Sequence, residues 1–252
     1  MLLYEFPFNE STRTLLRLEH LFDRLGQLVQ RDAALDHHFA LATLFEIVEL
    51  ALRTDLKGDL MKDIDRQRAQ YNAYRGNPAV AQEALEQVCS RLDRAFADLN
   101  ALQGKPGHQL SAHEMLNGLK NRIGMPGGTC EFDLPAYHAW QQRDGAQRRQ
   151  DLLQWMAPVM PLAQGVSLLL SLLRETGVPH KVAAVAGQFQ QSLGSGKPSL
   201  LARLRIDPAL GLVPEISGHR LMILVRLMRI DADGRSKLAA DQDVSLELSL
   251  CA

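Results

Sequence analysis

The feature that most constrains the fold is a change in hydrophobic period after Gly177 and Pro179. Between residue 9 and about residue 175, apolar residues recur every three or four positions, which is the spacing of amphipathic helices. After Pro179, apolar and polar residues alternate, which is the spacing of β-strands that bury one face. The sequence therefore predicts an α+β protein, in which a mostly helical domain is followed by a smaller antiparallel β domain.

The N-terminal segment also has the strand period. In LLYEFPF, residues 2–8, successive side chains alternate between two faces, and Pro7 is typical of an edge strand or a strand end. Asn9 is a good N-cap for the helix that follows. We therefore expect residues 1–8 to form a strand that joins the β domain, residues 9–178 to form the helical domain, and residues 179–252 to form the antiparallel β domain.

Two segments of the β domain show its strands most clearly. The first alternates between one face with Leu200, Ala202, Leu204 and Ile206 and another with Leu201, Arg203 and Arg205. The second, ISGHRLMILVRLMRI at residues 216–230, is apolar on both faces and is followed by DADG, a turn sequence. Because Val244 to Leu250 alternate again after that turn, we expect residues 216–250 to form one long antiparallel pair.

The bulk composition excludes several classes of protein. An apolar share of 46% with a net charge of −1 is typical of a globular protein and argues against a general nucleic-acid binder. The N-terminus has no signal-peptide pattern, which predicts a cytoplasmic location. The apolar segment at residues 165–173 is bounded by Pro161 and Arg174, so we expect a core or interface helix and no membrane insertion.

No motif for a cofactor or metal is complete. GSGKPS at residues 194–199 has Gln191 where a phosphate-binding loop needs its first glycine, and Pro198 where it needs Ser or Thr. The three cysteines are far apart, with no histidine at metal-ligand spacing. The best catalytic candidate is His138, which follows Asp133. An enzyme with an unrecognised site around Asp133 and His138 is therefore one alternative.

The other alternative is an interaction protein that binds an acidic or C-terminal peptide. It rests on basic residues in the β domain, namely Arg203, Arg205, Arg220, Arg226 and Arg229. Each one alone suits a solvated side chain or a pair with Asp207, Glu215, Asp231 or Glu247. Arg226, however, has apolar neighbours on both sides, where its stem can lie along a sheet and present its guanidinium to a peptide carboxylate.

Several segments also carry a family resemblance. They are FNESTRTLLRLEHL at residues 8–21, DIDRQ at 63–67, PGGTCEFDLPAYHAW at 126–140, and ISGH at 216–219 followed by Arg226. In this order they resemble the ZapD family of Z-ring-associated cell-division proteins over nearly the whole chain. The resemblance implies a cytosolic homodimer without catalytic activity or cofactor, with dimer contacts in the helical domain. The implied partner is FtsZ, the tubulin-like division GTPase, whose C-terminal tail the dimer binds at the mid-cell division ring, so that protofilaments are cross-linked and bundled for septation.

The resemblance also implies which residues contact the tail. Arg226 matches a basic position of the family's tail-binding pocket, Arg220 matches a position that is usually Lys or Arg, and Arg53 matches a basic position of the helical domain. Met222 and Glu114 stand where the family has arginine. These two departures lead us to expect a pocket displaced toward Arg203, Arg205 and Arg229.

Overall fold

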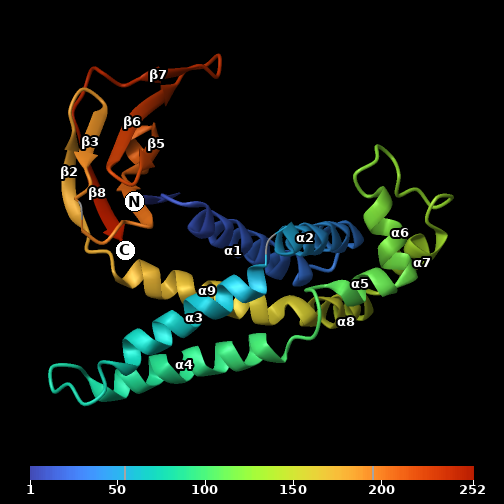
Figure 1. Cartoon of the computed structure of the whole chain (residues 1–252). Helices are drawn as coiled ribbons and strands as arrows, with labels where there is room; N and C mark the ends of the chain where they lie inside the picture. Colours follow the sequence, from blue (N-terminus) through green and yellow to red (C-terminus); the bar gives the residue numbers. More distant parts are fainter. Residues whose placement is uncertain (54, 195) are drawn as a thin grey trace. The chain divides into compact units, whose positions relative to one another are not determined.

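The structure, a computed structural model, describes residues 1–53, 55–194 and 196–252, and in addition leaves out the side chain of Ser111. Ser195 of the GSGKPS segment therefore lies outside the described residues. The chain forms two compact units, which we call the helical unit (Arg17–Leu169) and the β unit (Met1–Leu16 with Leu170–Ala252). Figure 1 shows their helices and antiparallel strands, and the predicted α+β class is confirmed.

The helices follow the apolar period of the sequence. They are α1 (Glu10–Val29), α2 (Ala34–Arg53), α3 (Leu56–Asn72), α4 (Gln82–Ala101), α5 (His108–Ala112), α6 (Glu114–Arg122), α7 (Pro135–Gln141), α8 (Gly145–Met156), the 3-10 turn η1 (Ala157–Val159) and α9 (Met160–Glu175). Asn9 caps α1 as predicted, because its side-chain oxygen accepts a hydrogen bond from the Thr12 amide at 2.7 Å. The apolar stripe of α1 is buried, with Leu18 at 0% and Leu25 at 1% exposure. Burial of such leucines is worth about 1.5–3 kcal/mol each, more than helix propensity alone supplies.

Helices α3 and α4 lie side by side as a helical hairpin (Figure 1). Arg68 of α3 joins them, because its Nε donates to an oxygen of Asp93 at 2.6 Å and its guanidinium lies 4.8 Å from the centre of the Phe96 ring. Gly76, in the connection, has φ of +77°, a conformation that side chains with a Cβ rarely adopt.

The C-terminal helices differ from the expectation in length. Together α8, η1 and α9 form one helical run from Gly145 to Glu175, which is long and apolar enough to cross a membrane by length and composition. The expected helix around residues 165–173 is α9 (Met160–Glu175), but Pro161 does not end the run before it, because this proline lies in the first turn of α9, where a missing N–H costs no hydrogen bond. Half of the most apolar window is buried inside the structure.

The β unit is a sandwich of two antiparallel sheets (Figure 1). Its strands are β1 (Leu2–Pro7), β2 (His180–Ala184), β3 (Gln188–Ser192), β4 (Leu201–Ile206), β5 (Leu212–His219), β6 (Met222–Ile230), β7 (Ser236–Leu238) and β8 (Val244–Cys251), with the 3-10 turn η2 (Pro208–Leu210) before β5. The first sheet has the order β1-β4-β8-β2, and the second has β3-β6-β5 with β7 beside β6. The inner faces share one core, to which Leu204, Ile206, Ile223, Val225 and Leu227 all contribute.

The strand pairing differs from the expected long pair of residues 216–250. The 216–230 segment bends at Arg220 and Leu221, so that β5 and β6 pair with each other. The DADG turn leads only to the short β7, whereas β8 pairs with β4 and β2 in the other sheet. The physical reason is that β3 already pairs with residues 222–226 of β6, which leaves only residues 228–230 for β7.

Candidate partner-binding surface

The structure separates the arginines that the sequence groups together. Those of the β unit lie on two opposite faces of the sandwich or at the ends of a strand. Arg203 and Arg205 lie on the outer face of the first sheet, Arg226 lies on the outer face of the second sheet, and Arg220 and Arg229 lie at the two ends of β6. Arg53 belongs to the helical unit, at the end of α2. The expectation of a pocket that combines Arg226 with Arg203 and Arg205 is therefore wrong.

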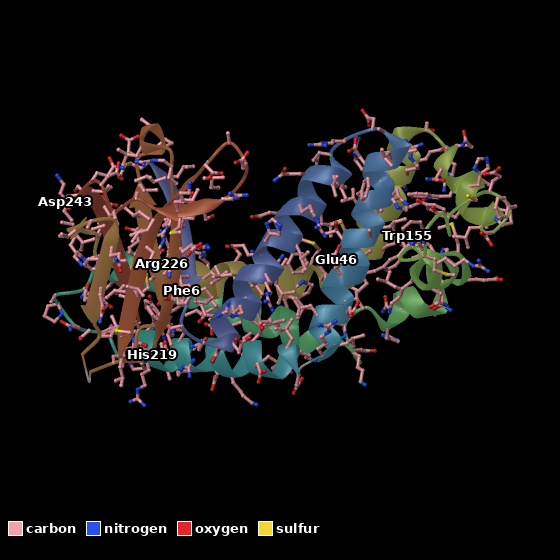
Figure 2. The ribbon with its side chains drawn as sticks, turned by 90° about the horizontal axis from the view of Figure 1, so that it is seen from above. Phe6, Glu46, Trp155, His219, Arg226 and Asp243 are labelled. Carbon is pink, nitrogen blue, oxygen red and sulfur yellow. The ribbon has the colours of Figure 1, made fainter. Side chains whose placement is uncertain are left out.

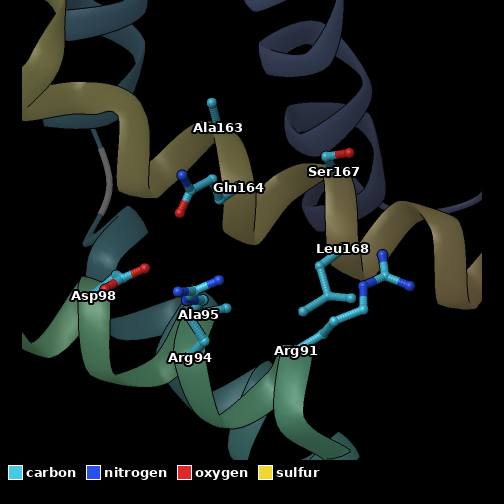
Figure 3. A pocket seen from close by; sticks show the side chains of 8 residues that line it. All are labelled: Arg91, Arg94, Ala95, Asp98, Ala163, Gln164, Ser167 and Leu168. Carbon is cyan, nitrogen blue, oxygen red and sulfur yellow. The ribbon is translucent and has the colours of Figure 1, made fainter. Parts of the chain in front are cut away.

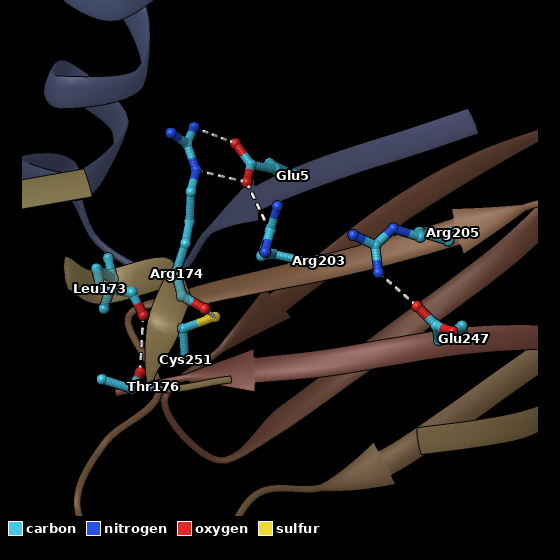
Figure 4. A network of polar contacts seen from close by, with 8 residues as sticks. All are labelled: Glu5, Leu173, Arg174, Thr176, Arg203, Arg205, Glu247 and Cys251. Atoms are coloured by element: carbon cyan, nitrogen blue, oxygen red, sulfur yellow. Dashed lines mark hydrogen bonds and ion pairs between the residues drawn. The ribbon is translucent and has the colours of Figure 1, made fainter. Parts of the chain in front are cut away.

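The arginines of the first sheet are held by carboxylates (Figure 4). Glu5 of β1 lies opposite Arg203 of β4 and accepts its Nε–H at 2.9 Å, and the same carboxylate accepts two bonds from Arg174 at 2.9 and 2.6 Å. Arg205 pairs with Glu247 of β8 at 2.5 Å. The side chains of Glu5 and Arg203 are only 16% and 22% exposed, so this cluster stabilises the sheet.

The outer face of the second sheet is different, and we call it the β6 face. It consists of Met222, Leu224 and Arg226 of β6, with Gln188 and Gln190 of β3 and Glu215, Ser217 and His219 of β5 beside them. The alternate residues Ile223, Val225 and Leu227 fill the core, which fixes the direction of these side chains. The β6 face is therefore an apolar stripe with polar neighbours and one central cation.

Arg226 keeps much of its guanidinium free for a ligand. Its Nη2 lies 3.1 Å from a carboxylate oxygen of Glu215, the residue directly opposite on β5. The two side chains are 48% and 52% exposed, so water screens the pair and it contributes about 0–1 kcal/mol to stability. A guanidinium has five N–H donors, so a second carboxylate can bind beside Glu215. Figure 2 labels Arg226 on β6 and His219 near the β5–β6 turn.

The other predicted contacts vary in their surroundings. Arg220 is exposed in the β5–β6 turn and has no ion pair with any residue that the structure describes. Arg229 lies 3.4 Å from Asp241, with both side chains about half exposed, and Arg53 forms an exposed pair with Glu49 one helical turn earlier. Of this set, Arg220 is closest in sequence to the β6 face.

The structure also locates Met222 and Glu114, the two residues that depart from the family pattern. Met222 belongs to the β6 face itself, where its sulfur lies 3.0 Å from the side-chain nitrogen of Gln190. Glu114 is the first residue of α6, where a negative charge is stabilised by the helix dipole. Met222 therefore adds apolar surface to the β6 face.

The residues of the alternative enzyme site are not arranged as an acid–base pair. Asp133 binds Arg122 at 2.7 Å, and His138 is exposed on α7. The described residues include no hydrogen bond between the two side chains, and no group of three His, Cys, Asp or Glu that could hold a metal. The geometry gives no support for catalysis there.

A buried polar cluster was missed by the sequence reading. Arg148 is 5% exposed; its Nε donates to Nδ1 of His37 at 3.0 Å, and its other nitrogens donate to the backbone oxygens of Asp32, Gln141 and Arg143. Burial lowers the pKa of His37, so its ring is neutral and can accept this bond. The signal in the sequence is that Arg148, Leu152 and Met156 recur every four residues, which places the arginine on the buried face of α8.

His38, the next residue of α2, forms a second contact, which is partly buried. Its Nδ1 lies 2.7 Å from the hydroxyl oxygen of Tyr137. Burial lowers the pKa of His38 and raises that of Tyr137, so both partners are neutral. Together with the Arg148 contacts, this bond ties α2 to α7 and α8.

Comparison with known proteins agrees with the resemblance. A family model described as ZapD, cell division protein, matches residues 16–226. Proteins named Cell division protein ZapD from Ralstonia nicotianae (strain ATCC BAA-1114 / GMI1000) and Ralstonia pickettii (strain 12J) are each 48% identical over 252 residues, covering 100% of this chain and 99% of the relative. The chain therefore belongs to the ZapD family of cell division proteins.

Proposed function

We propose that this protein is a non-enzymatic, cytoplasmic division protein that binds the C-terminal tail of FtsZ and, as a homodimer, cross-links and bundles FtsZ protofilaments at the mid-cell ring. One observation carries the proposal. On the β6 face, the half-exposed Arg226 lies in register between Gln188 of β3 and Glu215 of β5, beside the apolar side chain of Leu224. Such a surface suits a short peptide with both apolar side chains and a carboxylate.

The β6 face supplies two kinds of contact energy. Met222 and Leu224 offer apolar surface that a peptide can remove from water, at about 25 cal/mol per Å². Arg226 offers donors for a charge-assisted hydrogen bond, and the exposed Arg220 at the adjacent turn adds a second cation. We propose these two arginines as the primary tail contacts, with Arg229 at the far end of β6 and Arg53 in the helical unit as additional ones. Arg203 and Arg205 are the weakest candidates for tail contacts, because their guanidiniums already form ion pairs with Glu5 and Glu247.

Bundling requires at least two tail sites in one particle. A monomer with one site can decorate a filament but cannot join two filaments. A two-fold dimer presents two sites, and once one site is bound, the second site meets the tails of the polymer at a high effective concentration. We therefore propose a homodimer with contacts in the helical unit.

Co-sedimentation with FtsZ filaments tests this function. The protein is expected to pellet with filaments of full-length FtsZ and to remain in the supernatant with filaments that lack the C-terminal tail. Equal pelleting with both kinds of filament would contradict tail binding, and pelleting without bundles in electron micrographs would contradict cross-linking.

A further inference from the structure

The helical unit has an open groove between α4 and α9, with a volume of about 720 Å³. Figure 3 shows Arg91, Arg94 and Asp98 on α4, and Gln164 and Ser167 on α9. Ala95, Ala163 and Leu168 complete the lining. The spacing of positions 91, 94, 95 and 98 places these residues on one face of α4, so the helix presents two guanidiniums to one groove.

These two arginines differ from most others in the helical unit. Arg24, Arg66, Arg68, Arg75, Arg122 and Arg149 each bind a carboxylate. Arg91 and Arg94 are exposed and form no ion pair or hydrogen bond with any residue that the structure describes. Two unpaired cations at a spacing of three residues repel each other, and an anionic ligand removes this repulsion.

The remaining lining residues indicate the class of anion. Ala163, Gln164 and Ser167 are short or uncharged, so an extended chain can lie close to α9 without meeting a like charge. Asp98 is an acceptor, which disfavours a small phosphate ion but suits the backbone N–H groups of a peptide. Gln164 and Ser167 offer both donors and acceptors to a peptide backbone.

We propose that the α4–α9 groove binds an acidic peptide segment of a partner protein, at a site separate from the β6 face. Acidic side chains of the peptide bind Arg91 and Arg94, and its backbone amides donate to Asp98. This inference does not depend on recognition of the FtsZ tail by Arg226, because no residue of the groove belongs to the β6 face.

The experiment is fluorescence anisotropy with a labelled octapeptide of alternating Glu and Gly, added to the full-length protein at low ionic strength. The double variant Arg91→Gln/Arg94→Gln is expected to bind roughly tenfold more weakly, which corresponds to the loss of about one charge-assisted hydrogen bond. Ala163→Phe, which fills the groove without a change of charge, is expected to weaken binding as well. Circular dichroism melts of each variant show that the fold is retained.

Two controls fix the location. The matched control Arg66→Gln/Arg75→Gln makes the same change in net charge at arginines that are already paired, and it is expected to bind the octapeptide as the parent protein does. Arg226→Gln, which removes the cation of the β6 face, tests the alternative location of the octapeptide. An equal loss in the Arg66/Arg75 control would overturn the site as a general charge effect. A loss only in Arg226→Gln would overturn it by moving the octapeptide to the β6 face.

Competition identifies the ligand class. Inorganic phosphate and vesicles containing phosphatidylglycerol are expected to displace the octapeptide only at concentrations that screen charges in general. Displacement by millimolar phosphate that depends on Arg91 and Arg94 would replace the proposal with a small-anion site. The same dependence with vesicles would replace it with a membrane contact.

Discussion

Glu5 of β1 and Arg203 of β4 face each other across the first sheet, and the Glu5 carboxylate joins Arg203 to Arg174 at the end of α9. The three side chains are between 16% and 23% exposed. One carboxylate thus neutralises part of the charge of two arginines that water reaches only weakly. The contact also connects the N-terminal strand to the C-terminal half of the β unit.

Loss of this carboxylate is expected to destabilise the β unit. Glu5→Gln leaves two partly buried guanidiniums with a weaker acceptor, so the free energy of unfolding should fall by about 1–3 kcal/mol. The matched control is Glu10→Gln, which breaks the exposed Glu10–Arg13 pair and should cost at most about 0.5 kcal/mol. Urea unfolding of both variants measures the difference, and equal losses would show that Glu5 has no special structural part.

The stability of the helical unit is expected to depend on pH through His37. Burial lowers the pKa of His37 in the folded state below its ordinary value of 6.5, so the unfolded chain binds the proton more tightly. Above pH 6.5 the ring of His37 is neutral in both the folded and the unfolded state, and the free energy of unfolding has its full value. As the pH falls from 6.5 toward the lowered pKa, the free energy of unfolding decreases. Protonation also removes the acceptor that Arg148 uses.

A variant isolates the contribution of His37. His37→Asn keeps an oxygen that can accept from Arg148 but cannot titrate, so its unfolding free energy should fall less steeply between about pH 7 and pH 5. The measurement is urea unfolding at a series of pH values. Identical slopes for the variant and the parent protein would assign the pH dependence to other groups, such as His38.

The contrast between Arg203 and Arg226 shows where prediction from the sequence ends. Both lie between apolar neighbours in strands of period two, and this period correctly predicts which neighbours fill the core. The period does not predict which strand lies beside each arginine. Arg203 binds Glu5, 198 positions away in the sequence, whereas Arg226 binds the exposed carboxylate of Glu215 on the neighbouring strand β5. The same limit explains the wrong pairing of β8, because alternation specifies a face and leaves the neighbour open.

The proposed homodimer has a direct test. Light scattering at micromolar concentration is expected to give twice the mass of the chain, and a monomer mass would contradict the cross-linking mechanism. Leu41, Leu44, Val166 and Leu170 of the helices are buried within the chain. Leu170→Ala should therefore lower the free energy of unfolding by about 2–5 kcal/mol, as for a core residue.

Binding to FtsZ filaments is expected to weaken as salt is added. The charges of the β6 face are exposed, and at physiological ionic strength they are screened beyond roughly 8 Å, while the apolar contacts of Met222 and Leu224 are not. Co-sedimentation over a salt series should show a decline to a residual level. Binding that is independent of salt would indicate that Arg226 and the adjacent Arg220 have only a structural part.

Arg226 is the proposed primary contact to the tail, and its exposed pair with Glu215 allows a sharp test. Arg226→Glu places two carboxylates opposite each other and should cost about 1 kcal/mol of stability, far less than loss of a buried pair. The double variant Arg226→Glu/Glu215→Arg restores an ion pair with the positions exchanged. Arg205→Glu, on the opposite face of the sandwich, controls for a general change of charge.

The deciding measurement is the affinity of a synthetic FtsZ tail peptide for these variants, together with the melting temperature of each. Arg226→Glu and the double variant are both expected to lose binding by at least roughly tenfold, because the cation is no longer at position 226, while the double variant recovers its melting temperature. Arg205→Glu is expected to bind normally. If Arg226→Glu remains folded and binds the peptide as the parent protein does, Arg226 is not a tail contact and the proposed binding surface on the β6 face is wrong.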